Sequence, residues 1–289
     1  MMPSQRSPMY FFDCLLTALA PAIWGSTYIV TSQLLPPDRP FTAALIRVLP
    51  AGLLLLLFSP HLPAWRDCGR LLILSALNIG IFQTLLFLAA YRLPGGLAAV
   101  LGAIQPLFVM VLMWGVDKRT PKVLTLLAAF TGVAGMSLLL LSSRTVFDTL
   151  GVIAALVGAC SMAAGVWLAG RWKITLPITS LTGWQLVLGG LALVPATLFI
   201  DEPLPTLTTL HYLAYAWLSL AGALIAYGLW FRGIKRLPSV AVASLGLLSP
   251  IVAVLLGWIF LSQSLTLLQL TGLVIVLGSV VVVQLTARK

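Results

Sequence analysis

The residues that could do chemistry in this chain are aromatic and polar side chains placed inside long apolar runs. In the first run, Trp24, Tyr28 and Thr31 follow i, i+4, i+7 spacing and therefore share one face of a helix. Such a face suits an apolar or aromatic ligand, and its rings can also lie over an ammonium group by cation–π contact. Aromatic residues at this spacing more often serve packing or lipid contact. Trp24, however, lies in the middle of its run, far from the ends where tryptophans gather in membrane proteins, and this favours a binding role.

A proline inside each of two later runs indicates a second group of candidates. Pro106 and Pro250 each remove one backbone hydrogen bond, which is expected to kink the helix and free the carbonyl of the glycine four residues earlier. In a bilayer such a carbonyl must face protein or a water-filled cavity. Gln105 and Ser249 directly precede the two prolines, and we expect both to line that cavity. A packing kink against small residues would explain the prolines equally well.

The remaining candidates are polar or amphipathic residues inside other runs. They are Asn78, Gln83, Trp167, Tyr227 and Ser244. Because a buried polar group needs a partner, each of them either contacts a ligand or makes a hydrogen bond between helices. Arg47 is the one strong charge inside a run. It could bind a carboxylate of the ligand, but the sequence favours a side chain that reaches outward or bonds helix-end carbonyls.

Motifs for enzymatic chemistry and metal binding are missing from the sequence. There is no G-x-x-x-x-G-K-[ST] loop, no H-E-x-x-H, no G-x-S-x-G and no pair of acidic residues within the apolar runs. The three cysteines include no C-x-x-C pair, and neither histidine has metal-ligand spacing. We therefore expect no catalytic residues, no metal and no cofactor. The formal net charge of +10 comes from Lys and Arg in short loops, which argues against a nucleic-acid partner.

The elements that must position these residues are membrane-spanning helices. The chain of 289 residues is 60% hydrophobic and 8% charged, and its mean hydropathy of +1.08 is that of an integral membrane protein. A spanning helix needs about 20 apolar residues, and counting such runs predicts an all-α protein of ten transmembrane helices. The expected spans are residues 13–33, 41–59, 70–91, 95–116, 121–141, 150–170, 177–200, 210–234, 239–261 and 266–285.

The order of these helices contains an internal repeat. The segment Arg92–Trp114 matches Arg236–Trp258 at a constant offset of 144 residues, including the Arg-Leu-Pro start, one Gly, one Pro and the final Trp. Residues 47–53 match residues 185–191 at an offset of 138, which pairs Arg47 with the neutral Gln185. The chain is therefore expected to consist of two similar five-helix halves, residues 1–145 and 146–289.

An odd number of helices in each half inverts the second half relative to the first. With both termini in the cytoplasm, thirteen Lys and Arg fall in cytoplasmic segments and three in outer loops. The positive-inside bias therefore predicts an N-in, C-in topology. Two inverted halves can exchange conformations and open a midplane site first to one side and then to the other, so the repeat indicates a transporter.

Asp13 is the only carboxylate near a predicted span, at the cytoplasmic mouth of the first helix. Proton-coupled carriers often keep a buried acid as a relay, because a charge inside the membrane is costly and is retained for function. We interpret Asp13 as an interfacial acid at a helix N-terminus rather than as such a relay. The sequence thus favours facilitated transport, or a form of coupling that its residues do not reveal.

The motifs also resemble those of the EamA-type drug/metabolite transporter superfamily. The resemblance rests on Trp24-Gly25-Ser26, on Leu45-Ile46-Arg47 followed by Ala51-Gly52, and on the repeated Arg-Leu-Pro segment that ends in Trp. One departure is Ser161-Met162, which stands where the first half has Ile23-Trp24. The resemblance implies a basket-shaped carrier of the bacterial inner membrane that commonly exports amino acids or related small metabolites.

Together these observations predict an alternating-access exporter of small zwitterionic or uncharged metabolites, foremost amino acids with apolar or aromatic side chains. The expected cavity lies among helices one, three, four, six, eight and nine. Efflux of drugs or other hydrophobic compounds is the alternative, and an integral membrane enzyme is a more distant one. The expected partners are a small-molecule substrate and the lipid bilayer. Small residues at Thr131-Gly132 and Thr271-Gly272 suggest helix packing or a homodimer face.

Overall fold

The protein is built from helices joined by short loops. The structure, a computed structural model, describes residues 6–37, 39–92, 101–140, 148–172, 174–260 and 266–287, and within these ranges no strand occurs. In this part of the chain, eight helices are long and apolar enough to cross a membrane, and two shorter apolar helices lie at Gln105–Gly115 and Val123–Leu139. The chain is therefore an all-helical, multi-span membrane protein. The count of ten spans stays a prediction.

The described helices of the first half fall on the spans expected there, except that residues 95–100 of the fourth span lie outside the described residues. They are α1 (Arg6–Leu34), α2 (Pro40–Phe58), α3 (Trp65–Ser75), the π-helix η1 (Ala76–Gly80), α4 (Ile81–Arg92), α6 (Gln105–Gly115) and α7 (Val123–Leu140). The second half contains α8 (Thr149–Arg171), α9 (Ile178–Phe199), α10 (Thr209–Ser219), the π-helix η2 (Leu220–Ile225), α11 (Ala226–Arg236), α12 (Ser239–Leu245), α13 (Leu248–Phe260) and α14 (Leu267–Ala287).

The two π turns occupy matching places in the two halves. They begin at residues 76 and 220, and are thus separated by the same 144 residues as the sequence repeat. A π turn shifts the backbone hydrogen bonds and so leaves a carbonyl for another partner. The Leu77 carbonyl in η1 accepts a hydrogen bond from Ser161 Oγ at 2.9 Å, and the Gly222 carbonyl in η2 accepts one from Trp24 Nε1 at 2.9 Å. Each π turn therefore binds a helix of the other half.

A break in the helix, and not only a kink, occurs next to Pro250. The helix α12 ends at Leu245, and α13 begins two residues before Pro250. The Gly246 carbonyl, expected to be free, accepts the Ser249 backbone N–H at 3.1 Å. That expectation was wrong because the backbone tightens into an i+3 turn before the proline. In the first half, α6 likewise starts anew, with Pro106 in its first turn.

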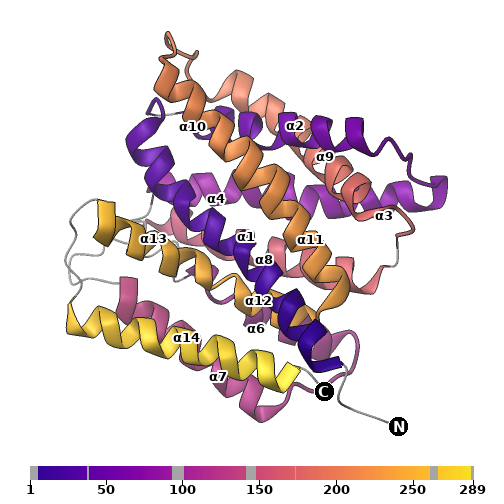
Figure 1. The fold of residues 1–289 in the computed structure, drawn as a ribbon, viewed down its shortest axis with the longest axis vertical. Coiled ribbons are helices and arrows are strands. Elements are labelled where there is room, and N and C mark those ends of the chain that lie inside the picture. Colours follow the sequence, from indigo (N-terminus) through magenta and orange to yellow (C-terminus); the bar gives the residue numbers. More distant parts are fainter. Residues whose placement is uncertain are drawn as a thin grey trace.

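The most extensive helix pair is formed by α7 and α14, which lie side by side at the lower edge of the fold (Figure 1). Their backbones meet at glycines. A Cβ placed on Gly272 would lie 2.6 Å from the Gly135 carbonyl oxygen and 2.6 Å from the Leu139 backbone nitrogen. The small residues of these two helices therefore serve packing between them.

The alanine variant of Gly272 tests this close approach. Gly272→Ala is expected to lower the free energy of unfolding by about 1–3 kcal/mol, because its methyl group meets backbone atoms that cannot turn aside. Thermal unfolding of the purified protein in detergent measures the effect. Gly278→Ala is the matched control, since no atom lies within 4 Å of a Cβ at that position of the same helix. Equal melting temperatures for the two variants would contradict the contact.

The first turns of α1 lie against the last turns of α14. The Tyr10 hydroxyl donates a hydrogen bond to the Gln284 backbone carbonyl at 3.2 Å, which ties the first turns of α1 to the last turns of α14. Figure 1 places the start of α1 and the end of α14 on the same side of the helices. This arrangement agrees with an even number of membrane crossings.

Candidate functional site

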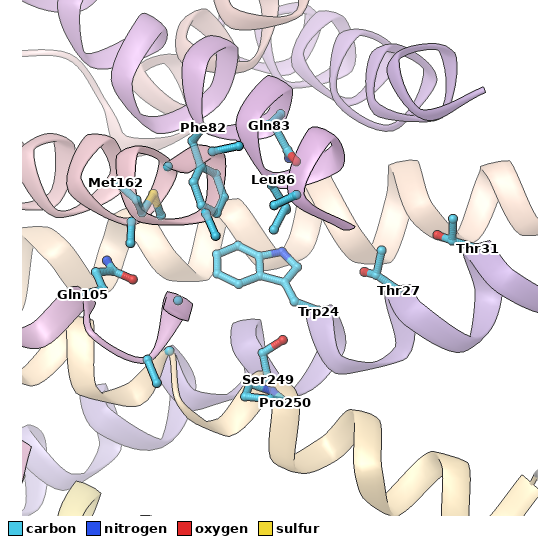
Figure 2. Close-up of a pocket in the computed structure, with 18 of the residues that line it drawn as sticks. Trp24, Thr27, Thr31, Phe82, Gln83, Leu86, Gln105, Met162, Ser249 and Pro250 are labelled. Atoms are coloured by element: carbon cyan, nitrogen blue, oxygen red, sulfur yellow. The ribbon is translucent and has the colours of Figure 1, made fainter. Parts of the chain in front are cut away.

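A cavity of about 750 Å³ lies among α1, α2, α4, α8, α11 and the two proline-associated breaks (Figure 2). It runs from Trp24, in the middle of α1, to Pro36 and Pro37 just beyond the end of that helix. Ala89, near the end of α4, and Ala154, near the start of α8, also line it. The cavity therefore extends toward the end of the molecule opposite to the Tyr10 contact. In the predicted topology this is the outer end.

An aromatic cluster forms the deep end of the cavity. The Trp24 ring lies 5.0 Å from the Tyr227 ring at 56° and 5.1 Å from the Trp230 ring at 57°. Tilted pairs of this kind are favourable because the edge of one ring meets the face of the next. The hydrogen bond from Trp24 Nε1 to Gly222 fixes the rotation of the indole, which projects into the cavity between Leu86 and Ser249 (Figure 2).

A buried hydrogen bond joins Gln83 and Tyr227 beside this cluster. Gln83 Nε2 donates to the Tyr227 hydroxyl at 2.7 Å, and both side chains are fully or almost fully buried. Both residues line the cavity. Their separation of 144 residues equals the offset of the sequence repeat, so the two positions correspond to each other in the two halves.

Several polar groups on the wall could serve a ligand. Gln105 and Ser249, the residues before the two prolines, both line the cavity, as the sequence predicts. Buried atoms without a hydrogen-bond partner in the described part of the chain are Gln83 Oε1, Gln105 Nε2, the Thr27 and Thr31 hydroxyls and Trp230 Nε1. Since such atoms are costly to leave unpaired, small rotations that offer them to a bound molecule or to water would be favourable.

Arg47 gives the cavity its charge. Its side chain is buried at 4% exposure, and its Nη2 donates to the Gly222 carbonyl at 3.3 Å, the carbonyl that also accepts from Trp24. Arg47 therefore bonds a carbonyl, as expected, but it does so inside a span and does not reach outward. Among the described residues that line the cavity it is the one charged side chain. The site is thus suited to a carboxylate and unsuited to an organic cation.

Three of the predicted site residues do not line this cavity, and a fourth, Tyr28, cannot be placed on it. Asn78 Nδ2 donates to Gln185 Oε1 at 2.9 Å between η1 and α9. Ser244 Oγ donates to the Ala241 carbonyl at 2.9 Å and accepts from Gln284 Nε2 at 3.0 Å. These two residues make the alternative contacts expected of polar groups between helices. Trp167 lies at the other end of the molecule, and the Tyr28 side chain falls outside the described residues.

Several residues that line the cavity were not predicted from the sequence. They are Thr27, Phe82, Leu86, Met162 and Trp230, among others. The repeat contains a signal for three of them, because Leu86 and Trp230 are 144 residues apart and Met162 corresponds to Trp24 at the offset of 138. Thr27 lies three residues after Trp24, on the same helix face. Tracing Trp24 to its counterpart would have found Met162, whereas Leu86 and Trp230 are counterparts of each other and neither was a candidate.

Comparisons with known proteins identify the family. The EamA-like transporter family matches residues 12–141 and again residues 149–285. The chain is 43% identical over 268 residues to the protein PecM of Dickeya dadantii (strain 3937), covering 92% of this chain and 90% of PecM. It is 29% identical over 272 residues to the uncharacterized inner membrane transporter YedA of Escherichia coli (strain K12), covering 91% of this chain and 87% of YedA.

A known crystal structure shares the fold. Its protein is 19% identical in sequence and superposes with a TM-score of 0.77 over 96% of this chain and 97% of its own. The two family matches together take in nearly the whole of the present chain and include the cavity residues of both halves. The protein is thus a multi-span membrane transporter of the drug/metabolite transporter superfamily, and it belongs to the EamA-like transporter family.

Proposed function

We propose that this transporter exports small zwitterionic or uncharged metabolites, foremost amino acids with apolar or aromatic side chains, across a bacterial inner membrane. The observation that carries the proposal is the combination of the Trp24 cluster with Arg47 in one cavity. The rings offer an apolar surface of the right shape for a hydrophobic side chain. Arg47 brings a positive charge to the cavity wall, which attracts a carboxylate. YedA, an inner membrane transporter by name, supports the location.

Alternating access between two inverted halves of five helices, residues 1–145 and 146–289, is the mechanism that we propose. Several correspondences support it. The π turns start 144 residues apart, and the family matches each half separately. Arg47 contacts η2 through Gly222, and its counterpart Gln185 contacts η1 through Asn78, the residue that corresponds to Gly222. Equivalent helices thus make equivalent contacts in the two halves, which is what exchange of their conformations requires.

The state described here fits the outward-facing member of that cycle in the predicted N-in, C-in topology. The cavity reaches the loop after α1 at one end. At the other end, Asp13 is buried at 7% exposure and pairs with Arg232 at 2.6 Å and Arg236 at 3.5 Å, joining α1 to α11. Opening toward the cytoplasm would separate these groups. A homodimer stays a proposal, and the close pairing of α7 with α14 accounts for the small residues that first suggested it.

The chemistry of the cavity gives less support to the two alternatives, drug efflux and enzymatic activity. Carriers of cationic drugs need a negative group in the binding site, whereas the charged residue on the described wall is Arg47. The described residues hold no group of three or more potential metal ligands. No nucleophile with an adjacent base faces the cavity in that part of the chain either, so the site supports binding and release rather than a reaction.

Counterflow in proteoliposomes tests the proposal. Vesicles are preloaded with one unlabelled amino acid, and uptake of the labelled form from outside is followed. We expect transient accumulation with apolar and aromatic amino acids and its strong reduction by Gln105→Ala, which removes an amide from the cavity wall. Ser244→Ala is the control, because Ser244 contacts α14 and does not line the cavity. Absence of accumulation across the whole panel would exclude amino acids as the cargo.

A further inference from the structure

A second cavity, of about 660 Å³, lies at the predicted cytoplasmic end. Its walls are the last residues of α6, α8 and α11 and the first residue of α12, Ser239. The same four helices border the main cavity farther along. In α8, Met162 of the main cavity is followed five residues later by Trp167 of the second, a rise of roughly 7 Å. The two cavities therefore lie one after the other along the same four helices.

The second cavity carries an excess of positive charge. Arg119, Arg171, Lys235 and Arg236 line it together with one carboxylate, Asp117. The Asp117 carboxylate is already engaged, since it accepts hydrogen bonds from Arg171 and, at 2.8 Å, from Trp167 Nε1. The cations thus outnumber the acid, and their mutual repulsion favours entry of an anionic group.

The neutralisation of these cations is incomplete. Arg236 reaches Asp13 at 3.5 Å, whereas Lys235 Nζ donates to the Leu176 carbonyl at 3.0 Å. Neither Arg119 nor Lys235 forms an ion pair within the described part of the chain. A carboxylate that bridges Arg119 and Lys235 would satisfy both, in a place that water and small solutes can reach.

Trp167 lines the charged cavity and is held there by two neighbours. Arg171 Cζ is 5.3 Å from the Trp167 ring centroid in a cation–π contact, and Asp117 holds both side chains. A carboxylate that draws Arg171 away from Asp117 would remove the cation–π contact and leave the indole held by its hydrogen bond to Asp117 alone. Arg171, one of the cations that attract an anion, is thus linked directly to the Trp167 indole.

We propose that the second cavity is a loading site that binds the carboxylate of the cargo before it passes to Arg47. Binding there draws Arg171 away from Asp117 and from the Trp167 ring. The proposal rests on the carrier function above and adds to it the requirement for an anionic group on the cytoplasmic side. It also makes Arg119 and Lys235 determinants of selectivity, although both are remote from the Trp24 cluster.

Protection of a single cysteine from a maleimide tests the loading site. Cys14, Cys68 and Cys160 are first replaced by serine, and Ser239→Cys is introduced in the full-length protein in phosphatidylcholine nanodiscs. Benzoate is the probe, and benzamide is its neutral counterpart of the same shape. We expect benzoate at about ten times its Kd to slow labelling about tenfold and benzamide to have little effect. Equal protection by both, or by neither, would overturn the proposal.

Charge variants and lipid composition separate the remaining explanations. Arg119→Gln combined with Lys235→Gln should abolish protection by benzoate, whereas Arg66→Gln, which removes an exposed cation outside the cavity, should not. If phosphatidylglycerol in the nanodiscs protects the introduced thiol and benzoate does not, the cavity binds a lipid headgroup and the loading site is refuted. Should the double variant not fold, the comparison of benzoate with benzamide still decides.

The two proposals fail in different ways. Counterflow that persists while benzoate gives no protection would refute the loading site and leave the carrier intact. Protection by benzoate with no counterflow for any amino acid would refute the proposed cargo and leave an anion site. If both proposals hold, the wild-type protein accumulates an aromatic amino acid. The Arg119 and Lys235 double variant then loses loading of that amino acid from the cytoplasmic side but still binds it from the outer side.

Discussion

Replacing Trp24 by alanine is expected to weaken cargo binding about 30- to several-hundred-fold. A buried aromatic residue at the centre of a binding surface contributes roughly 2–4 kcal/mol when it is truncated. Here the loss includes the contacts with Tyr227 and Trp230. The half-saturation concentration for counterflow of labelled phenylalanine, measured at equal protein density, reports the effect.

Two further tryptophan variants give this experiment its controls. Trp24→Phe retains a ring but loses the hydrogen bond to the Gly222 carbonyl, so its defect should be intermediate. Trp258→Ala removes a ring that is 52% exposed on the surface of α13 and should leave counterflow unchanged. If Trp24→Ala and Trp258→Ala behaved alike, the cargo would not contact the aromatic cluster.

Replacing Arg47 by glutamine is expected to abolish the preference for carboxylate-bearing cargo. Hydrogen bonds to a charged group contribute about 1.5–3 kcal/mol, which corresponds to roughly 10- to 150-fold in affinity. Competition by phenylalanine against labelled cargo should weaken by this factor, whereas competition by phenethylamine, which lacks the carboxylate, should weaken little or improve. Glutamine is the residue that the second half carries at the corresponding position, Gln185.

The comparison with Arg47→Lys distinguishes charge from geometry. Lysine keeps the positive charge but loses the two parallel donors, so part of the preference should return. Arg66→Gln removes an exposed charge elsewhere and should change neither competitor. A parallel loss of affinity for phenylalanine and phenethylamine in Arg47→Gln would instead assign Arg47 to the packing of α2 against η2.

The apolar runs and the prolines predicted where helices lie, but not where they begin and break. The first span was expected at residue 13, whereas α1 begins at Arg6, because the apolar residues before Asp13 continue the helix. The residues of the π turns do not differ in type from those of the neighbouring α-helices, so the sequence did not predict them. Only their matching positions relate the π turns to the repeat. Hydropathy detects the amount of apolar surface in a run and is insensitive to the hydrogen-bond pattern inside it.

The sequence predicted which helix segments border the cavity, but not which face of each helix is turned toward it. Trp24, Gln83, Gln105, Tyr227 and Ser249 line the cavity as expected. Ser244 does not, although its neighbour Ala243 does, because one residue turns a helix by about 100° and directs the hydroxyl to α14. Polarity alone does not select between two adjacent residues. Packing of the neighbouring helices makes that choice.

The hydrogen bond between Gln83 and Tyr227 has a consequence for the transport cycle. It joins two positions that correspond to each other in the two halves. If the halves exchange conformations, position 83 takes the place of position 227 and position 227 takes the place of position 83, so the same two residues still face each other. Asp13 and Arg232 do not occupy corresponding positions. Contacts of this kind must therefore break on one side of the membrane when their equivalents form on the other. In the alternating-access cycle that we propose, the Gln83 amide and the Tyr227 hydroxyl can therefore stay joined while the two halves move about them.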